Sequence, residues 1–302
     1  MFAELLREGG LSLDRLHSFC LVAQAGGVTK AAKGDPARQS MYSRQIKELE
    51  EFFGTELIRR KGRGIALTEA GARLNIITRE CCAALSDFKS DCGNQPVEVV
   101  IGAGESVIQW LLMPRLDKIR EHLPDIRFKF LNLPTADAVK RLADGLIDFA
   151  LVRKDAVGRT LQAKPIGVMG YSLFIPATLQ ANTGRKDGLK LLDGLPLATL
   201  EGEGSFRGEL AQATKKAGVK LNIQIECSSF PLVARAVAMG NVAAILPSIA
   251  TTDLPATDVV RLPVSFLKAL DRDMCLASNA RLIRIRPMLQ KAGEELAVIC
   301  GF

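Results

Sequence analysis

The chain has 302 residues, of which 48 % are hydrophobic and 24 % are charged. This composition is typical of a soluble globular protein and excludes a mainly disordered chain, and the length suits two or three domains. The formal net charge of +7 permits a polyanionic partner, because clustered Lys and Arg side chains neutralise phosphates.

Neither a membrane span nor a metal site is predicted. The amino-terminal residues lack the basic leader and apolar core of a secretory signal, and no later run approaches the roughly 18 uncharged apolar residues of a membrane span. We therefore expect a cytoplasmic protein. The seven cysteines form no Cys-x-x-Cys pair, and only His17 and His122 could join them as nitrogen ligands. We expect free thiols and no metal or other cofactor.

Two helices are predicted at the start of the chain. Ser12 precedes a segment with apolar residues at helical spacing, which ends at Gly26-Gly27. Thr29 is expected to cap a very short second helix at residues 30–33. Gly34 follows at a position where helices often end with a left-handed residue.

A third helix is predicted to begin at Asp35 and Pro36 and to stop at Gly54. Asp35 can accept N–H bonds as the N-cap, and Pro36 suits the first turn, where its missing N–H has no cost. An apolar stripe for the core is formed by Tyr42, Ile46, Leu49 and Phe53. Polar side chains that can bind base edges or phosphates occupy the other faces: Gln39, Ser40, Ser43, Arg44 and Lys47. If this helix is considered alone, its polar residues are better explained as a solvent-exposed face than as a DNA-binding face.

A basic hairpin is predicted at residues 57–67, where two short apolar strands flank a glycine-containing turn. Four cations fall within five residues: Arg59, Arg60, Lys61 and Arg63. Such a run is usually a solvated loop. Following a short helix, a tight turn and a polar-faced helix, however, it is typical of a winged helix-turn-helix, in which the long helix enters the major groove and the wing contacts phosphates or the minor groove.

Thr68 is expected to cap a long helix from Glu69 to about Asp91. Its apolar positions 74, 77, 81, 84 and 88 keep the three-four repeat of a coiled-coil seam. From periodicity alone, packing against the body of its own chain is equally consistent. Residues 93–96 then form a hinge.

The segment from Leu13 to Leu74 resembles the LysR-type transcriptional regulators without a gap. The resemblance rests on Thr29-Lys30-Ala31-Ala32, Gln39-Ser40, Ser43-Arg44-Gln45-Ile46, Leu49-Glu50, Gly54, Gly62-Arg63-Gly64 and Leu67-Thr68-Glu69-Ala70-Gly71. It implies that the third helix is the recognition helix. The DNA-binding candidates are Arg38, Gln39, Ser40, Ser43, Arg44, Lys47, Arg60, Lys61 and Arg63. In the family the next helix pairs two subunits, so the dimerisation candidates are Leu74, Ile77, Cys81, Leu85 and Phe88.

The sequence departs from the family at the turn between the second and third helices. Asp35 and Arg38 stand where the family usually has a bulky apolar residue and a capping Ser. We therefore expect a shorter second helix and an earlier start of the recognition helix, which leaves the contacts of residues 36–38 open.

Beyond Pro96, short apolar strands alternate with amphipathic helices. This order predicts an α/β sheet with parallel strands and helices on both faces. A first series comprises strands at 97–102, 126–131 and 147–152 and helices at 106–122 and 135–144. A second comprises strands at 171–175, 197–200, 223–227 and 242–246 and helices at 205–217 and 231–239. A strand at 273–277 and a helix at 282–299 are expected to return to the first sheet.

The predicted fold is multidomain: an all-α-rich winged helix-turn-helix with a long linker helix, followed by a two-lobed α/β effector-binding domain. The resemblance continues at residues 110–114, 142–152 and 244–247 and implies the effector domain shared with periplasmic solute-binding proteins. The expected bounds are 1–67 for the DNA-binding domain, 68–95 for the linker helix and hinge, and 96–302 for the effector domain. Lobe I is expected at 96–165 and 266–302, and lobe II at 166–265.

An effector site is expected at the carboxyl ends of the strands, where helix N-termini supply unpaired N–H groups. Each Ser or Thr there is as consistent with a helix cap as with a ligand contact. Three acids, Glu105, Glu201 and Glu203, are expected near the cleft, so we hypothesise a zwitterionic, polar or cation-bearing effector. Positions of effector contact in the family map onto Ser106, Thr135, Arg153, Ser205, Phe206, Ser228 and Ser229.

The preferred prediction is a sequence-specific transcriptional regulator that is not an enzyme, binds promoter DNA and a small effector, and forms a dimer or tetramer. An enzyme is the first alternative, because Gly102-Ala103-Gly104 follows a strand as a partial dinucleotide fingerprint. Val107 replaces its third glycine, and no catalytic set can be assembled. A solute-binding module without a role in transcription is the second alternative.

Overall fold

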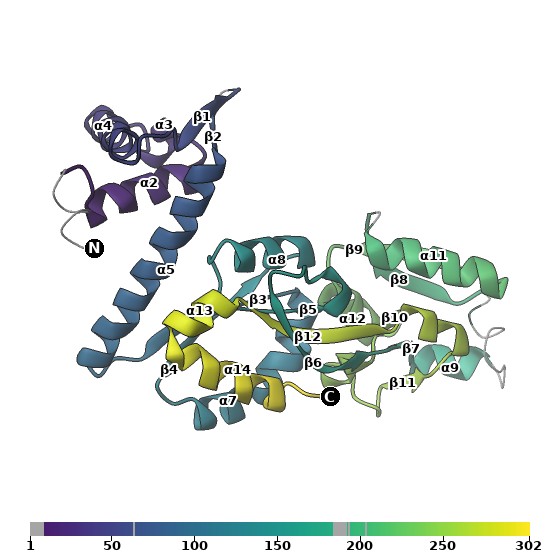
Figure 1. Cartoon of the computed structure of the whole chain (residues 1–302). Coiled ribbons are helices and arrows are strands. Elements are labelled where there is room, and N and C mark those ends of the chain that lie inside the picture. Colours follow the sequence, from purple (N-terminus) through teal and green to yellow (C-terminus); the bar gives the residue numbers. More distant parts are fainter. Residues whose placement is uncertain (1–8, 63, 184–191, 193, 203) are drawn as a thin grey trace. The chain divides into compact units, whose positions relative to one another are not determined.

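The chain folds into two compact units, with the division after Asn94, and each is described by itself. The computed structural model describes residues 9–62, 64–183, 192, 194–202 and 204–302 (Figure 1). Within these ranges no helix is both long and apolar enough to cross a bilayer.

The first unit is a winged helix-turn-helix. Its elements are α2 (Leu13–Ala25), α3 (Val28–Ala31), α4 (Pro36–Phe53), β1 (Ile58–Lys61), β2 (Gly64–Leu67) and α5 (Glu69–Cys92). The hairpin is antiparallel, with Ile58 paired to Leu67 and Lys61 to Gly64. The buried core consists of Phe19, Cys20, Val22, Ala32, Tyr42, Ile46, Leu49 and Leu57. The predicted helices and hairpin are thus confirmed, together with most of the apolar stripe on α4.

Three predicted N-caps are confirmed. The Ser12 hydroxyl accepts from Arg15 N at 3.2 Å, and the Asp35 carboxylate accepts from Ala37 N at 2.9 Å. The Thr68 hydroxyl accepts from Gly71 N at 3.0 Å and donates to the carbonyl of Glu56 at 2.7 Å. These side chains satisfy N–H groups that have no partner within the helix.

Two details of the prediction are wrong. Thr29 is not a cap: α3 begins at Val28 with Gly27 as its N-cap, so Thr29 already lies inside the helix. Phe53 does not join the buried stripe and is 38 % exposed, since the last turn of α4 extends past the core. Its ring instead meets Phe52 edge to face at 5.0 Å.

Close backbone contacts join α4, the hairpin and α5. The Glu50 carboxylate on α4 accepts from the N–H groups of Leu57 and Ile58, at 2.8 and 3.2 Å. A Cβ atom at Gly71 would lie 1.9 Å from the carbonyl oxygen of Leu57, closer than any side chain can approach. Position 71 therefore requires glycine for the hairpin to pack against α5.

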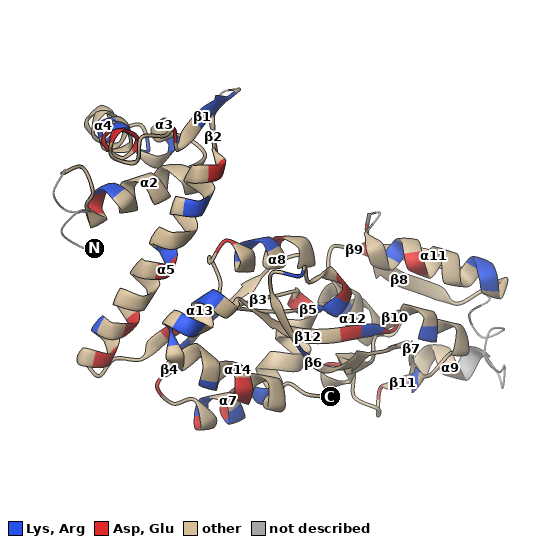
Figure 2. Ribbon diagram, in the orientation of Figure 1, with Lys and Arg blue, Asp and Glu red and all other residues tan. Residues whose placement is uncertain are grey.

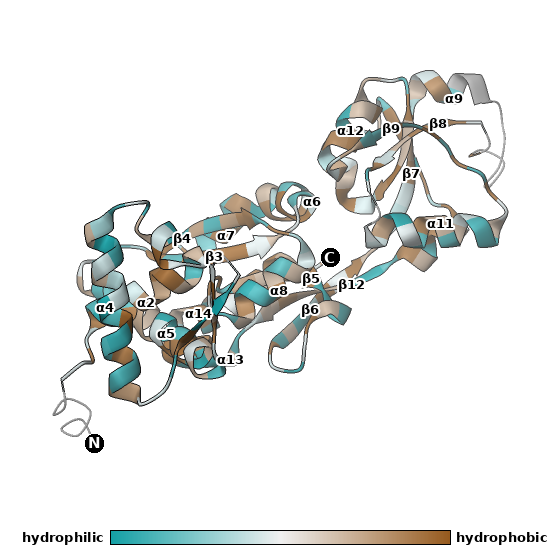
Figure 3. Cartoon of the chain, turned by 90° about the horizontal axis from the view of Figure 1, so that it is seen from above, coloured by the Kyte–Doolittle hydropathy of each residue, from teal (hydrophilic) through white to brown (hydrophobic). Residues whose placement is uncertain are grey.

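Lobe I of the second unit is a five-stranded sheet with helices on both faces (Figure 3). The strand order is β4 (Ile126–Asn132), β3 (Val97–Ala103), β5 (Phe149–Arg153), β12 (Arg272–Ser278) and β6 (Gln162–Met169). The first three strands are parallel, and β12 runs antiparallel to both of its neighbours. One face packs on α7 (Leu116–His122) and α14 (Pro287–Ile299), and the other on α8 (Thr135–Ala143).

Lobe II is a second five-stranded sheet. The order is β11 (Val259–Leu262), β7 (Tyr171–Pro176), β10 (Ala243–Pro247), β8 (Pro196–Leu200) and β9 (Asn222–Cys227), and α9 (Ala177–Thr183) follows β7 along the chain. One face packs on α11 (Ser205–Ala217) and the 3-10 segment Ser265–Leu270, and the other on α12 (Phe230–Ala238).

The chain crosses between the lobes twice, at Gly170 and at Asp271. The predicted return of the last strand and helix to the first sheet is confirmed. The strands β6 and β11 and the helix α9 were not predicted. Pro165 and Gly167 interrupt the apolar alternation of β6, and both residues are atypical of a strand interior.

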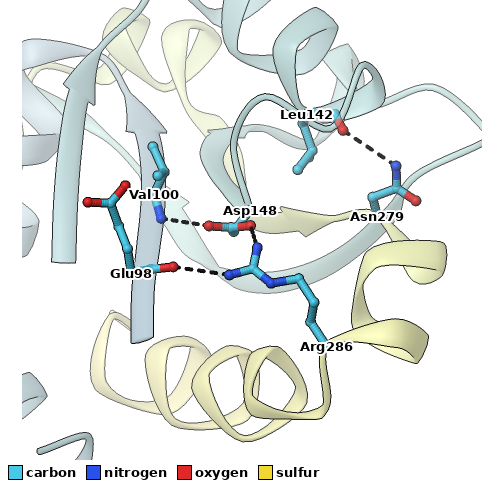
Figure 4. Close-up of polar contacts among 6 residues, drawn as sticks. All are labelled: Glu98, Val100, Leu142, Asp148, Asn279 and Arg286. Atoms are coloured by element: carbon cyan, nitrogen blue, oxygen red, sulfur yellow. Dashed lines mark hydrogen bonds and ion pairs between the residues drawn. The ribbon is translucent and has the colours of Figure 1, made fainter. Parts of the chain in front are cut away.

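A buried ion pair anchors the returning segment to lobe I (Figure 4). Arg286 pairs with Asp148, and both side chains are almost fully buried. Asp148 also accepts from Val100 N at 2.7 Å, and Arg286 donates to the carbonyl of Glu98 at 3.1 Å. This network therefore links three segments that are distant in the sequence.

Two predicted helices are interrupted at prolines. The segment predicted at 106–122 consists of α6 (Glu105–Val107), a π-helical turn, a 3-10 turn containing Pro114, and α7. The segment predicted at 282–299 is split into α13 (Ala280–Ile285) and α14, which begins at Pro287. Proline lacks the N–H for an interior helical bond and keeps the preceding residue, here Arg286, out of the helical region.

Candidate nucleic-acid interface and effector site

One face of α4 is polar and accessible. Ser40, Ser43, Arg44 and Lys47 are exposed, on the side away from the buried stripe. The side chains of Arg44 and Lys47 are 74 and 77 % exposed and lie 3.7 and 3.6 Å from Glu48 and Glu51 on the next turn. Such exposed pairs are weak, so both cations remain available to phosphates or base edges.

Arg38 and Gln39 do not belong to this face. Successive residues turn by about 100° around a helix, so Arg38 lies about 160° away from Ser40. Its side chain is exposed and lies 3.4 Å from the carboxylate of Asp35. Gln39 is half-buried and lies on the flank that carries Ile46.

The hairpin presents a row of cations (Figure 2). Arg60 and Lys61 are exposed on β1, as is Arg59, which was not among the DNA-binding candidates. The charge run in the sequence already included Arg59. The predicted contact Arg63 lies outside the described residues. The hairpin is held to the end of α2 by a bond of 3.1 Å from Ile65 N to the carbonyl of Gly26.

The helix α5 carries an exposed apolar stripe. Ile77, Leu85 and Phe88 are 58, 48 and 67 % exposed, and Cys81 is exposed between them. Leu74, the fifth dimerisation candidate, instead packs against the core of the winged unit. The four exposed residues fall within about 80° of one another around the helix.

Three effector candidates lie at the carboxyl ends of adjacent parallel strands in lobe I. Ser106 follows β3, Thr135 follows β4, and Arg153 ends β5. Ser106 is not the N-cap of α6, because Gly104 occupies that position. The fold therefore brings these three residues to one edge of the sheet, as predicted.

The lobe II candidates have different environments. Ser205 and Ser228 are exposed, whereas Phe206 is buried against the core that packs on α11. Ser229 is the N-cap of α12, accepting from Leu232 N at 3.5 Å. The capping interpretation thus accounts for Ser229.

An ion cluster joins the two lobes at Arg153. The guanidinium of Arg153 lies 3.8 Å from the carboxylate of Glu209 on α11 and 3.7 Å from that of Asp155. The other oxygen of Glu209 pairs with Arg272, at the crossing into β12. Glu209 and Arg272 were not identified from the sequence. Each is an ordinary charged residue in the sequence, and only the fold places lobe II and the crossing into β12 beside the end of β5.

Tyr171 lies beside this cluster and was also missed. Burial raises the pKa of its phenol to about 12, and the charge of Arg272 lowers it by a smaller amount. Its ring stacks on Phe206 at 5.2 Å and lies 6.2 Å from that of Phe230. Tyr171 therefore stays protonated near neutral pH and connects the aromatic group of lobe II to the ion cluster.

The lobes also meet at Trp110, in the π-helical turn. Its side chain is buried in the lobe II core that packs on α12, and its Nε1 donates to Asp253 at 2.8 Å. Gln109 donates to the same carboxylate. Trp110 thus adds a largely apolar contact between the lobes to the ionic contact at Arg153.

Gly102, near the end of β3, has a packing role. A Cβ atom at Gly102 would lie 2.7 Å from Ile147 Cδ1 and 3.0 Å from Leu133 Cδ1. This close packing explains Gly102 in the partial dinucleotide fingerprint, and Gly104 is the N-cap of α6. Within the described residues, no group of three or more His, Cys, Asp or Glu side chains is arranged to hold a metal ion.

Comparison with known proteins agrees with this architecture. Residues 13–72 match the family model of the bacterial regulatory helix-turn-helix protein, lysR family, and residues 95–288 match that of the LysR substrate binding domain. A probable nitrogen assimilation transcriptional activator of Synechococcus elongatus is 27 % identical over 251 residues, which cover 80 % of this chain and 81 % of the relative.

Solved structures share the fold across almost the whole chain. CbnR in complex with its target DNA has a TM-score of 0.57 at 18 % identity, covering 93 % of this chain and 100 % of that one. LysG of Corynebacterium glutamicum with bound effector Arg has a TM-score of 0.59 at 16 % identity, covering 94 and 99 %. The chain therefore belongs to the LysR family of DNA-binding transcriptional regulators with an effector-binding domain, and is not an enzyme.

Proposed function

We propose that α4 reads an operator in the major groove while the β1–β2 hairpin contacts the flanking backbone. The observation that supports this most directly is the accessible face of α4, with hydroxyl and cationic side chains at Ser40, Ser43, Arg44 and Lys47. Arg is the side chain best suited to bidentate contact with guanine, and Ser can bind any base edge or a phosphate. The hairpin cations then contribute binding that does not depend on sequence.

Arg38 and Gln39 have separate proposed roles at the start of α4. Arg38 points away from the Ser40 face and is proposed to contact a phosphate beside the helix N-terminus. Gln39 is proposed to reach DNA from the flank of the helix.

The operator is proposed to contain two half-sites. The stripe of Ile77, Cys81, Leu85 and Phe88 on α5 is apolar and exposed, and burying it against the same stripe of a second copy would remove this surface from water. A symmetric pair presents two copies of α4, which require two related half-sites. A tetramer would combine two such pairs.

A small molecule bound between the lobes is proposed to control how the paired recognition helices meet DNA. The proposed contacts are the residues at the carboxyl ends of β3, β4 and β5 together with the facing residues of lobe II. Bacterial promoter DNA lies in the cytoplasm, and this is the location proposed for the protein.

Two single variants test the assignment of α4 and the hairpin. Binding of the full chain to DNA upstream of its own gene is measured by fluorescence anisotropy across a salt titration, with unrelated DNA as the competitor. We expect Arg44→Ala to lower the preference for the specific site by roughly 1–3 kcal/mol, since a base contact is lost. Lys61→Ala should weaken binding to all sequences alike and reduce the salt slope by about 1.

A loss of sequence preference in Arg44→Ala together with a uniform loss of affinity in Lys61→Ala would support base contact by α4 and phosphate contact by the hairpin. Equal affinity of the wild-type chain for specific and unrelated DNA, with no effect of Arg44→Ala, would contradict the proposal.

A further inference from the structure

Glu209 is the centre of the contact between the lobes. Its carboxylate lies between Arg153, from the end of β5 in lobe I, and Arg272, from the crossing into β12. The side chains of Arg153, Glu209 and Arg272 are 27, 33 and 14 % exposed. Two arginines that converge on one carboxylate form an arrangement that binds carboxylate ligands in general.

The other charged groups nearby are mainly acidic. Asp155 pairs with Arg153 at 3.7 Å. A polar cavity of about 470 Å³ opens at the crossing, where it gives access to Arg272, and its lining residues are Lys154, Asp155, Asp271, Arg272 and Asp273. With Glu209 in place, each arginine of the pair already has an anionic partner.

We propose that Arg153 and Arg272 form an anion-binding site between the lobes, which the chain fills with the carboxylate of its own Glu209. The carboxylate of a small zwitterionic effector replaces Glu209 on the arginines, and the ammonium group of that effector pairs with the released Glu209. This proposal rests on the proposed control by a small molecule, and it makes Glu209 a specificity-determining residue of that site.

The charge balance explains why a zwitterion is preferred. A ligand with carboxylates alone would leave the released Glu209 without a cation and add negative charge at a cavity already lined by Asp155, Asp271 and Asp273, and like charges at close range are unfavourable. A zwitterion brings one cation with its one anion, so it leaves the net charge of the cluster unchanged. The same exchange removes the direct ionic contact of Glu209 with Arg153, while the contact of Trp110 with lobe II remains. The effector therefore acts on the ionic contact between the lobes and not on the contact at Trp110.

The site is tested with the variant Glu209→Gln and with malonate as the probe. Removing the competing carboxylate frees both arginines, so malonate should bind Glu209→Gln at least about tenfold more tightly than wild type, as measured by isothermal titration calorimetry of the full chain without DNA. The double variant Glu209→Gln/Arg153→Ala should lose this gain. Glu226→Gln is the matched control, because it also removes one acid from an arginine pair of lobe II, Arg207–Glu226 at 2.9 Å.

These measurements distinguish an effect of Glu209 on its two arginines from an effect of the net charge of the protein. Equal malonate affinity of Glu209→Gln and Glu226→Gln would overturn the proposal, as would retention of the gain in the double variant. β-Alanine, which has the three-carbon chain of malonate with an aminomethyl group (CH2–NH3⁺) in place of one carboxylate, should gain less than malonate from Glu209→Gln. An equal gain would contradict the role of Glu209 as the cation partner.

A second variant covers the case in which Glu209→Gln does not fold. Glu209→Asp keeps the charge but withdraws the carboxylate from the arginines by one methylene, so a smaller gain in malonate affinity is expected, and wild-type affinity would contradict the proposal. Since the assay contains no DNA, it is independent of whether α4 binds an operator. Failure of operator binding alone would therefore leave this result unaffected.

Discussion

At the scale of single residues, the winged unit depends on how closely α5 approaches the hairpin. Gly71 lies in the first turns of α5, and a Cβ atom there would meet the carbonyl oxygen of Leu57 at 1.9 Å. A backbone carbonyl cannot move aside as a flexible side chain can. The Thr68 hydroxyl accepts from Gly71 N at 3.0 Å, so a shift at this position also disturbs the N-cap.

We expect Gly71→Ala to lower the free energy of unfolding of the winged unit by roughly 1–3 kcal/mol, because one methyl group overfills the contact. Gly208→Ala on α11 is the control, since nothing lies within 4 Å of its added Cβ atom. That change should be neutral or stabilise its helix by up to about 1 kcal/mol. Denaturation followed by circular dichroism compares the two. An unchanged transition in Gly71→Ala would show that the hairpin can yield to the added methyl group without loss of stability.

At the scale of elements, α4 and α5 combine an inner face that forms the core with an outer face that is free to bind. On α4 the outer face is polar, as expected of a helix that meets DNA. On α5 the outer face is apolar at Ile77, Leu85 and Phe88, which a solitary helix would not favour. Periodicity predicted the stripe on α5, but only the structure distinguishes Leu74, which packs inward, from the exposed residues.

We expect Phe88→Asp to weaken self-association at least about tenfold, because pairing would bury an unpaired carboxylate in an apolar seam. Ser86→Asp is the matched control: Ser86 is also exposed but lies on the opposite side of α5. Sedimentation velocity of both variants measures the change. A similar loss in Ser86→Asp would point to net charge as the cause, and no loss in Phe88→Asp would remove α5 from the interface.

At the scale of the whole molecule, the effector unit depends on contacts between distant parts of the chain. Arg286, before α14, pairs with Asp148 at the start of β5 and donates to Glu98 on β3 (Figure 4). This network fixes the returning segment beside strands that precede it by more than a hundred residues.

We expect Arg286→Met to lower the free energy of unfolding of the effector unit by about 3–5 kcal/mol, since the buried carboxylate of Asp148 loses its arginine. Arg127→Met is the control, because the pair Arg127–Glu98 is exposed, with an N–O distance of 2.7 Å. That variant should change stability by less than about 1 kcal/mol. Urea unfolding of the two proteins gives the comparison, and equal losses would show that burial does not set the strength of the Arg286 pair.

Most elements and the family follow from the sequence alone, because these depend on local signals. Caps at Ser12, Asp35 and Thr68, helical and strand periodicity, and the spaced motif between Leu13 and Leu74 all lie within short stretches of chain. The two wrong predictions, Thr29 as an N-cap and Phe53 as a buried residue, concern single positions near the ends of helices. They arose because the preceding turn decides where α3 begins and the extent of the core decides where the buried stripe of α4 ends.

Which distant residues meet, by contrast, depends on the folded structure. Sheet order, the crossings at Gly170 and Asp271, and the convergence of Glu209 and Arg272 on Arg153 depend on contacts between segments that carry no shared local pattern. An isolated Glu on an amphipathic helix has the same appearance in the sequence whether it faces water or a pair of arginines. The sequence could therefore name Arg153 as a candidate effector contact, but the fold was required to show that it pairs with Glu209 of lobe II.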